Sequence, residues 1–136
     1  MMRIGIFIIS IVFTIIRVWL VEARHDYEVA RMREPGKQSL WKVFGNINEM
    51  TQLAVPVGIL SIFMGTAYLM LFPILMFVWW AVHDITLGLL LTGNPWHLGS
   101  GWFDQQVSAI FQTSGKIAFG YKIFVLIILS GIYFAL

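Results

Sequence analysis

The clearest pattern in the chain is a series of apolar stretches at residues 4–20, 53–92 and 116–136. A helix needs about 20 apolar residues to cross the ~30 Å hydrocarbon core of a bilayer. The middle stretch is long enough for two such helices, and Pro73 lies near its centre. The pattern therefore predicts four membrane-spanning helices, at residues 4–20, 53–72, 73–92 and 116–135.

Two of the polar stretches between these spans have a helical repeat. Apolar residues recur on one face of residues 39–52, where Ser39 is suited to cap the first turn, and on one face of residues 102–113. Amphipathic helices of this kind lie in the membrane interface with the apolar face toward lipid. The expected fold is an all-α integral membrane protein with four transmembrane helices and two interfacial helices, in a single membrane domain over residues 1–136.

Composition indicates that lipid, not water, is the main solvent of the chain. Apolar residues make up 59% of it and charged residues 12%, against roughly a quarter charged in an average soluble domain. So few charges cannot cover a soluble globule, which excludes an ordinary soluble domain. The absence of cysteine excludes a small scaffold held by disulfides and leaves the redox compartment open.

The positions of the basic residues predict the orientation of the chain. Six of the nine Lys and Arg residues lie between Arg17 and Lys42, two more lie at the start of the last span, and Arg3 alone lies on the other side. By the positive-inside rule, loops 21–52 and 93–115 with their interfacial helices are cytoplasmic, and both termini face outward. We therefore expect a multi-pass protein of a membrane such as the bacterial inner membrane.

The basic residues between the first two spans have two interpretations. Basic side chains near a membrane surface can bind anionic lipid headgroups. The candidates are Arg24, Arg31, Arg33, Lys37 and Lys42. Acidic residues are interleaved with them, so we favour the interpretation that the run is a topology signal. A net charge of only +2 does not favour a nucleic-acid partner.

His83 and Asp84 are the most informative ionisable residues, because they lie within a predicted span. An ionisable group at that depth is costly and is a functional candidate by default. One interpretation is a proton or ion pathway that uses Asp84 and His83. The other, which we favour, is that Asp84 ties the bundle together by bonding a helix end or one of the basic residues Arg17, Lys116 and Lys122.

The sequence offers no complete metal or catalytic site. Adjacent His and Asp residues on a helix point about 100° apart, so neither His25-Asp26 nor His83-Asp84 is placed to chelate one ion. His97 and Asp104 remain as candidate metal ligands, but no metal and no other cofactor is expected. No Ser, His and Asp arrangement indicates nucleophilic catalysis, so we do not expect an enzyme.

Small residues repeat along the second predicted span. Ala54, Gly58, Ser61 and Gly65 share one helical face, the pattern that lets membrane helices pack closely. Gly88, one turn after Asp84, gives the third span a similar point of close approach. A protein with only four helices has more surface of this kind than it needs internally.

Asp84 is followed by Gly93, Gly99, Ser100 and Asp104 in an order that resembles a pattern in other proteins. It is similar to small, uncharacterised multi-span membrane proteins of bacterial genomes, often of the Bacteroidetes type and prophage-associated, over residues 79–111. Two features depart from that pattern, because no Asn lies between Asp84 and Gly93 and Thr92 stands in place of an Arg. The resemblance implies a recurring unit of helix, turn and interfacial helix, and implies no reaction.

The functional expectation is a non-enzymatic membrane component that packs against other membrane subunits or copies of itself in the lipid bilayer. The small-residue face motivates it. The alternative is a component of a proton or ion channel or transporter, motivated by Asp84 and His83. A phage holin-like protein ranks lower because the chain ends in Phe134-Ala135-Leu136 without a basic tail. A lipid-modifying enzyme also ranks lower, because it would need a polar cavity around Asp84, His97 and Asp104.

Overall fold

The computed structural model describes residues 2–23, 25–27, 38–96 and 115–136, and within them no residue is in a β-strand. The chain begins with α1 (Met2–Arg17), which continues into the π-helical turn η1 (Val18–Glu22). Next come α3 (Gln38–Met64) and the 3₁₀ turn η2 (Thr66–Met70). The last two helices are α4 (Leu71–Thr92) and α6 (Gly115–Ala135).

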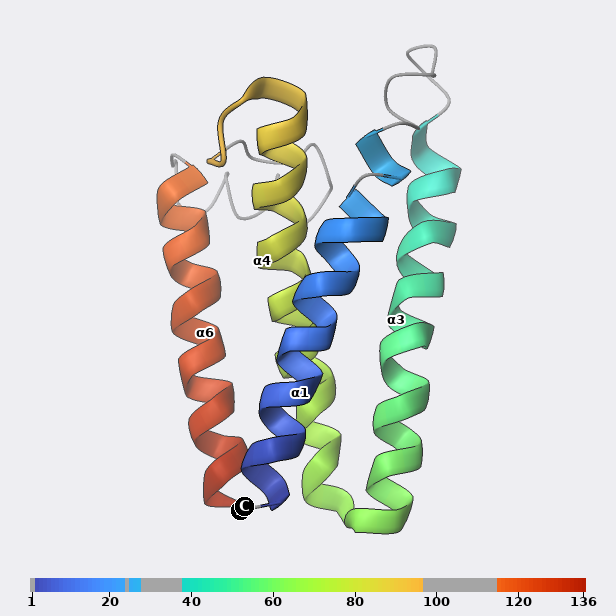
Figure 1. Ribbon diagram of the computed structural model, residues 1–136, viewed down its shortest axis with the longest axis vertical. Helices are drawn as coiled ribbons and strands as arrows, with labels where there is room; N and C mark the ends of the chain where they lie inside the picture. The colour runs from blue at the N-terminus through green and yellow to red at the C-terminus, as the bar shows by residue number, and fades with distance from the viewer. Residues whose placement is uncertain (1, 24, 28–37, 97–114) are drawn as a thin grey trace.

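The helices run side by side along the long axis of the molecule, with α4 behind α1 and between α6 and α3 (Figure 1). α4 contacts α1, α3 and α6, so it is the central helix of the bundle. We call the end that holds Tyr27, Thr92 and Gly115 the upper end, as in Figure 1. The lower end holds Met2, Gly65 and Leu136, so α1 starts where α6 finishes.

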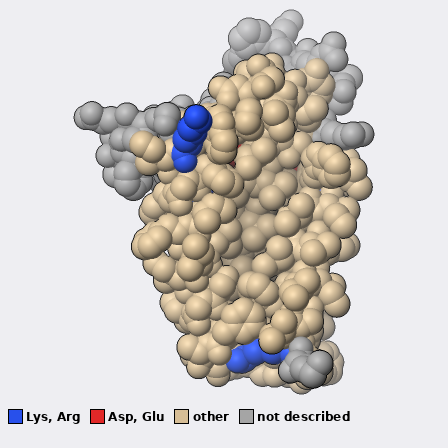
Figure 2. Space-filling view, turned by 60° about the vertical axis from the view of Figure 1, so that its left-hand side comes forward, with Lys and Arg blue, Asp and Glu red and all other residues tan. Residues whose placement is uncertain are grey.

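In the part of the chain that the structure describes, four helical stretches are long and apolar enough to cross a membrane: Met2–Tyr27, Ile47–Met64, Thr66–Thr92 and Gly115–Ala135. This confirms the predicted number of such helices. The outer surface of these helices is apolar, as expected of a surface in contact with lipid. Ile9, Phe63 and Ile127, for example, are mostly exposed. On the face in Figure 2 the visible Lys and Arg residues lie at the two ends, with uncharged surface between them. Such an apolar belt is typical of a membrane protein.

The predicted division of residues 53–92 at Pro73 is wrong. The chain turns at Gly65, whose φ of 109° is open to glycine but strained for other residues. Gly65 N donates a hydrogen bond to Ser61 O at 3.0 Å, and Tyr68 N donates one to Gly65 O at 3.1 Å, which closes the turn. Pro73 lies in the first turn of α4, where a missing N–H leaves no intrahelical bond unmade.

The predicted interfacial helix at 39–52 is not a separate element. Its residues form the first part of α3, which runs on without interruption to Met64. No Gly or Pro lies between Asn46 and Val55, and a change from polar to apolar residues does not by itself end a helix. The other predicted interfacial helix, at 102–113, lies outside the described residues.

The main apolar core lies in the lower half of the bundle. Its buried residues are Leu53, Val57, Tyr68, Leu71, Ile74, Leu75 and Tyr133. Phe7 of α1 stacks on Tyr133 of α6 with ring centroids 5.5 Å apart. The Arg3 guanidinium lies 5.2 Å from the centre of the Tyr133 ring, so Arg3, the one basic residue described at this end, is held against the aromatic core.

Candidate functional site

Ionisable side chains from α1, η1, α3, α4 and α6 gather in the upper half of the bundle. Asp84 lies in α4, eight residues before the helix ends, which places it about 12 Å below the upper end at 1.5 Å per residue. We call this group the polar cluster. Its members are Arg17, Glu22, Asp26, Glu49, His83, Asp84 and Lys122.

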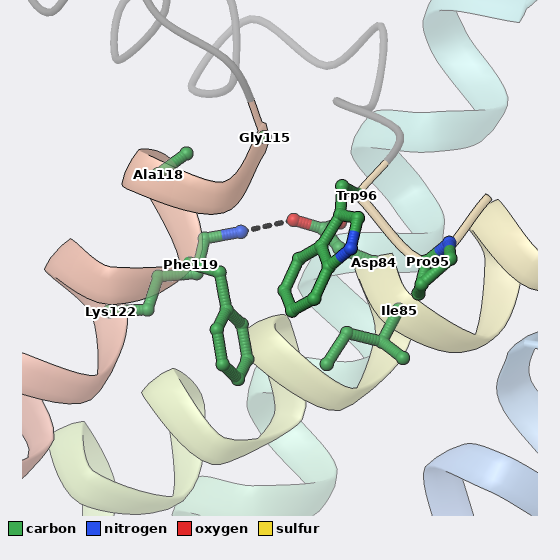
Figure 3. A pocket seen from close by; sticks show the side chains of 8 residues that line it. All are labelled: Asp84, Ile85, Pro95, Trp96, Gly115, Ala118, Phe119 and Lys122. Carbon is green, nitrogen blue, oxygen red and sulfur yellow. Dashed lines mark hydrogen bonds and ion pairs between the residues drawn. The ribbon is translucent and has the colours of Figure 1, made fainter.

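Asp84 and Lys122 join α4 to α6. The Lys122 ammonium donates a hydrogen bond to Asp84 Oδ2, and the two side chains are 3% and 15% exposed. Figure 3 shows them pointing toward each other, with the Trp96 and Phe119 rings beside them. Lys122 Nζ also lies 3.6 Å from the centre of the Trp80 ring. Lys122 is therefore a buried cation with an anionic and an aromatic partner.

His83 joins α4 to the helical residues that follow η1. Its Nε2 lies 2.9 Å from Asp26 Oδ2, and its ring stacks on Trp79 with centroids 5.1 Å apart. On its other side, Nδ1 lies 3.9 Å from Asp84 Oδ1. His83 thus sits between two carboxylates, one of them paired with Lys122.

Glu22 is placed by the π-helical turn. Arg17 Nη2 lies 2.5 Å from Glu22 Oε1, although Glu22 is five positions further along the chain. A π-helix bonds residue i to i+5, so the wider turn brings side chains five apart onto one face, where an α-helix would separate them. Trp79 Nε1 donates a hydrogen bond to Glu22 Oε2. This second contact fixes the buried Glu22 against α4.

Glu49 is the contribution of α3 to the polar cluster. Its carboxylate interacts electrostatically with Glu22, Asp26, His83 and Arg17. Its Oε2 is buried and has no hydrogen-bond partner among the described residues. In the described part of the polar cluster, four carboxylates therefore face Arg17, Lys122 and His83, so acidic groups outnumber the permanently charged basic ones.

The structure brings together some of the residues that the sequence singled out. His83 and Asp84 both belong to the polar cluster, and Lys122 was one of the basic partners considered for Asp84. Glu22, Asp26 and Glu49 were not recognised as site residues. One signal could have found two of them, since Glu22 and Asp26 are four residues apart, as are Trp79 and His83, so each pair shares a helical face.

Other predicted site residues lie apart from this group or outside the described residues. Ala54 is exposed on α3, and a Cβ added to Gly58 would meet nothing within 4 Å. Ser61 Oγ donates to Gly58 O at 2.8 Å, Gly65 forms the turn, and Gly88 is buried in α4. The headgroup candidates Arg24, Arg31, Arg33 and Lys37, the side chain of Lys42, and the metal-ligand candidates His97 and Asp104 are outside the described part.

The described residues contain no group of three His, Asp or Glu side chains arranged to hold a metal ion. A narrow cleft beside the Asp84–Lys122 pair is lined by Trp96, Phe119 and Ile85 among others (Figure 3). It is closed on one side by the close approach of α6 to residue 96, because a Cβ on Gly115 would lie 1.8 Å from the Trp96 carbonyl oxygen. Comparison with protein-family models, curated proteins and solved structures found no match to this chain.

Proposed function

We propose that this chain is a four-span integral membrane protein that acts as a non-enzymatic interaction component, packing against copies of itself or other membrane subunits. In this proposal the upper end is cytoplasmic and both termini face outward, in line with the distribution of Lys and Arg. The observation that carries the proposal is the face of α3 that no other described helix covers.

α3 is the least supported helix of the bundle. It contacts α4 and η2, and within the described residues none of its Cα atoms lies within 8 Å of α1 or α6. Ile62 and Phe63 are 80% and 81% exposed, and the position of Gly58 opens onto empty space. In lipid, small residues on an open face favour close approach of another helix, because the two backbones can come into van der Waals contact.

The polar cluster supports a structural role rather than a catalytic one. Asp84, His83 and Glu22 each bond a residue of another helix or turn. Buried polar contacts, above all the Asp84–Lys122 ion pair, fix which helices neighbour one another and in which register. We infer that they hold the bundle in the arrangement that presents α3 outward.

The test is the size of the particle in mild detergent, measured by light scattering. We expect the wild-type protein to form oligomers and Gly58→Leu to dissociate them, because the larger side chain separates the packed backbones. Gly120→Leu on α6 is the matched control, since Gly120 also opens onto empty space, and should leave the particle size unchanged. A monomeric wild-type protein would contradict packing against copies of itself, and equal effects of both substitutions would contradict the role of the α3 face.

A proton pathway is the second candidate, favoured by one observation. Titratable groups follow one another from the buried Lys122 through Asp84, His83 and Asp26 to His25, whose Nδ1 lies 3.5 Å from Asp26 Oδ1. The His25 side chain is 58% exposed, so the series reaches the protein surface. Such a series can form the upper part of a proton pathway across the membrane.

Proton flux into liposomes tests this candidate. If the series carries protons, Asp84→Asn abolishes flux, and Thr86→Val, two residues beyond Asp84 but with its hydroxyl bonded to Val82 O, leaves it intact. Flux that is equal in the wild-type protein and Asp84→Asn would remove the candidate.

A further inference from the structure

An apolar groove runs along the side of the bundle between α1 and α6. The two helices both pack on α4 but, within the described residues, their Cα atoms do not come within 8 Å of each other. The space left between them is about 510 Å³, a size typical of a ligand site. Ala81 and Val78 of α4 form its floor, and Ile11 and Ile123 are among its walls. The recess lies on the face shown in Figure 2.

The groove has one closed end and one polar end. At the lower end Phe7 closes it against α6, with ring centroids 4.9 Å from Phe134 and 5.5 Å from Tyr133. At the upper end Ile85 and Phe119 line both the groove and the narrow cleft beside Asp84 and Lys122. An apolar slot therefore opens at its upper end beside charged groups.

The length of the groove matches one leaflet of a bilayer. On α6 its lining extends from Phe119 to Ser130, which is about 16 Å at 1.5 Å per residue. Half of a hydrocarbon core is about 15 Å thick. The polar end at Phe119 lies about 6 Å below the start of α6, within reach of the headgroups of that leaflet, and the Trp96 ring beside Phe119 is of a residue type enriched at that level.

An exposed positive charge lies at the same end. Lys116 is exposed, and its Nζ is 6.0 Å from the centre of the Trp96 ring. The neighbouring Lys122 and Asp84 balance each other's charge. Among the described residues, the mouth of the groove therefore carries the net positive charge of Lys116, which attracts an anionic headgroup.

We propose that the groove between α1 and α6 holds one acyl chain of an anionic phospholipid from the leaflet at the upper end, with its headgroup beside Lys116. This inference rests on the proposed membrane placement but not on the proposed packing of α3. Both shape and charge favour this occupant. The groove can accept an acyl chain from its upper, polar end, where Lys116 lies, and aromatic rings close its lower end.

The test uses spin-labelled phosphatidylglycerol and phosphatidylcholine, added to phosphatidylcholine vesicles that contain the full-length protein. We expect an about fivefold preference of the immobilised lipid for phosphatidylglycerol, the factor that one lysine near a headgroup supplies. Lys116→Gln should reduce this preference to about one. Ser130→Phe should remove the immobilised phosphatidylglycerol by filling the groove, and Ile123→Phe fills it from a second position if the first variant does not fold.

Ile128→Phe is the matched control, because Ile128 lies on α6 but does not line the groove. Equal immobilisation of the two lipids, or full phosphatidylglycerol binding by both groove-filling variants, would overturn the proposal. So would crosslinking of Ile127→Cys to a second copy, which would show a helix in the groove; the native chain has no cysteine to confuse that result. Loss of the protein from vesicles in alkaline carbonate would instead contradict the membrane placement itself.

Discussion

The upper and lower halves of the bundle are held together by different chemistry. In the upper half, ion pairs and hydrogen bonds join α4 to η1, to the helical residues that follow η1, and to α6, as between Asp84 and Lys122. In the lower half, aromatic and aliphatic side chains fill the space between helices, with Tyr133, Leu71 and Ile74 completely buried. Arg3 is the exception there, and it lies against rings rather than a carboxylate.

The difference teaches which contacts can specify a helix bundle in lipid. Lipid tails solvate an apolar side chain as well as a protein core does, so apolar packing gains only from better van der Waals contact. A charged group that loses its partner finds no comparable partner in lipid, so leaving it unpaired lowers the stability of the bundle substantially. We therefore expect the upper half to determine which helices are neighbours and the lower half to adjust to them.

The largest expected effect comes from removing the buried lysine. Lys122→Met leaves Asp84 buried without its cation, and we expect the free energy of unfolding to fall by about 3–5 kcal/mol. The measurement is reversible unfolding in mixed micelles, followed by tryptophan fluorescence. A loss below about 1 kcal/mol, the value of an exposed pair, would show that water reaches Asp84 and would remove the contrast between the halves.

A smaller effect is expected where α6 begins. Gly115→Ala places a Cβ against the Trp96 backbone, and overpacking of this kind costs about 1–3 kcal/mol. Gly120→Ala on the same helix meets no atom within 4 Å and should be neutral or slightly stabilising, because alanine restricts the unfolded chain. Equal unfolding free energies for both variants would show that α6 is free to shift at its upper end.

In the lower half, Ile74→Ala tests the apolar packing. The side chain is fully buried, and in a soluble core its loss would cost about 2–5 kcal/mol. Because lipid supplies no comparable transfer energy, we expect about 1–2 kcal/mol, by the same unfolding measurement. Ile62→Ala, at an 80% exposed position, should change little in the monomer. A loss in Ile74→Ala as large as that in Lys122→Met would reverse the comparison.

The smallest effect is expected at the surface end of the polar cluster. Asp26 is 43% exposed, and Asn at this position can still accept a hydrogen bond from His83. Asp26→Asn should therefore cost about 0.6 kcal/mol, the usual value of one interhelical hydrogen bond in a membrane. A loss above about 2 kcal/mol would place Asp26 among the buried ties, and the contrast within the upper half would disappear.

Much of the fold was predictable from the sequence because long apolar stretches differ so clearly from their flanks. The position of the turn between α3 and α4 was not, since glycine and proline are both residue types that can end a helix and the sequence has Gly65 and Pro73 close together. Proline is tolerated in the first turn of a helix, where Pro73 lies. Gly65 instead has a positive φ, which is incompatible with an α-helix, so the helix ends there. The same limit applies at the start of α3, where polarity changes along the helix without ending it.

The candidate site was predictable only in part, for a related reason. Asp84 and His83 stand out because charged residues are rare in their surroundings. Glu22 and Asp26 lie in a polar flank, where acidic residues are common, so nothing in their local sequence distinguishes a buried position from an exposed one. The Arg17–Glu22 pair also depends on a π-helical turn, which α-helical spacing does not predict.

A double-mutant cycle between Asp84 and Lys122 tests the central claim most directly, namely that a buried ionic tie specifies the bundle. The unfolding free energies of Asp84→Asn, Lys122→Met and the double variant are compared with that of the wild-type protein. We predict a coupling energy of about 2 kcal/mol or more, with the double variant more stable than Lys122→Met alone. Additive effects, within about 0.5 kcal/mol, would contradict the account.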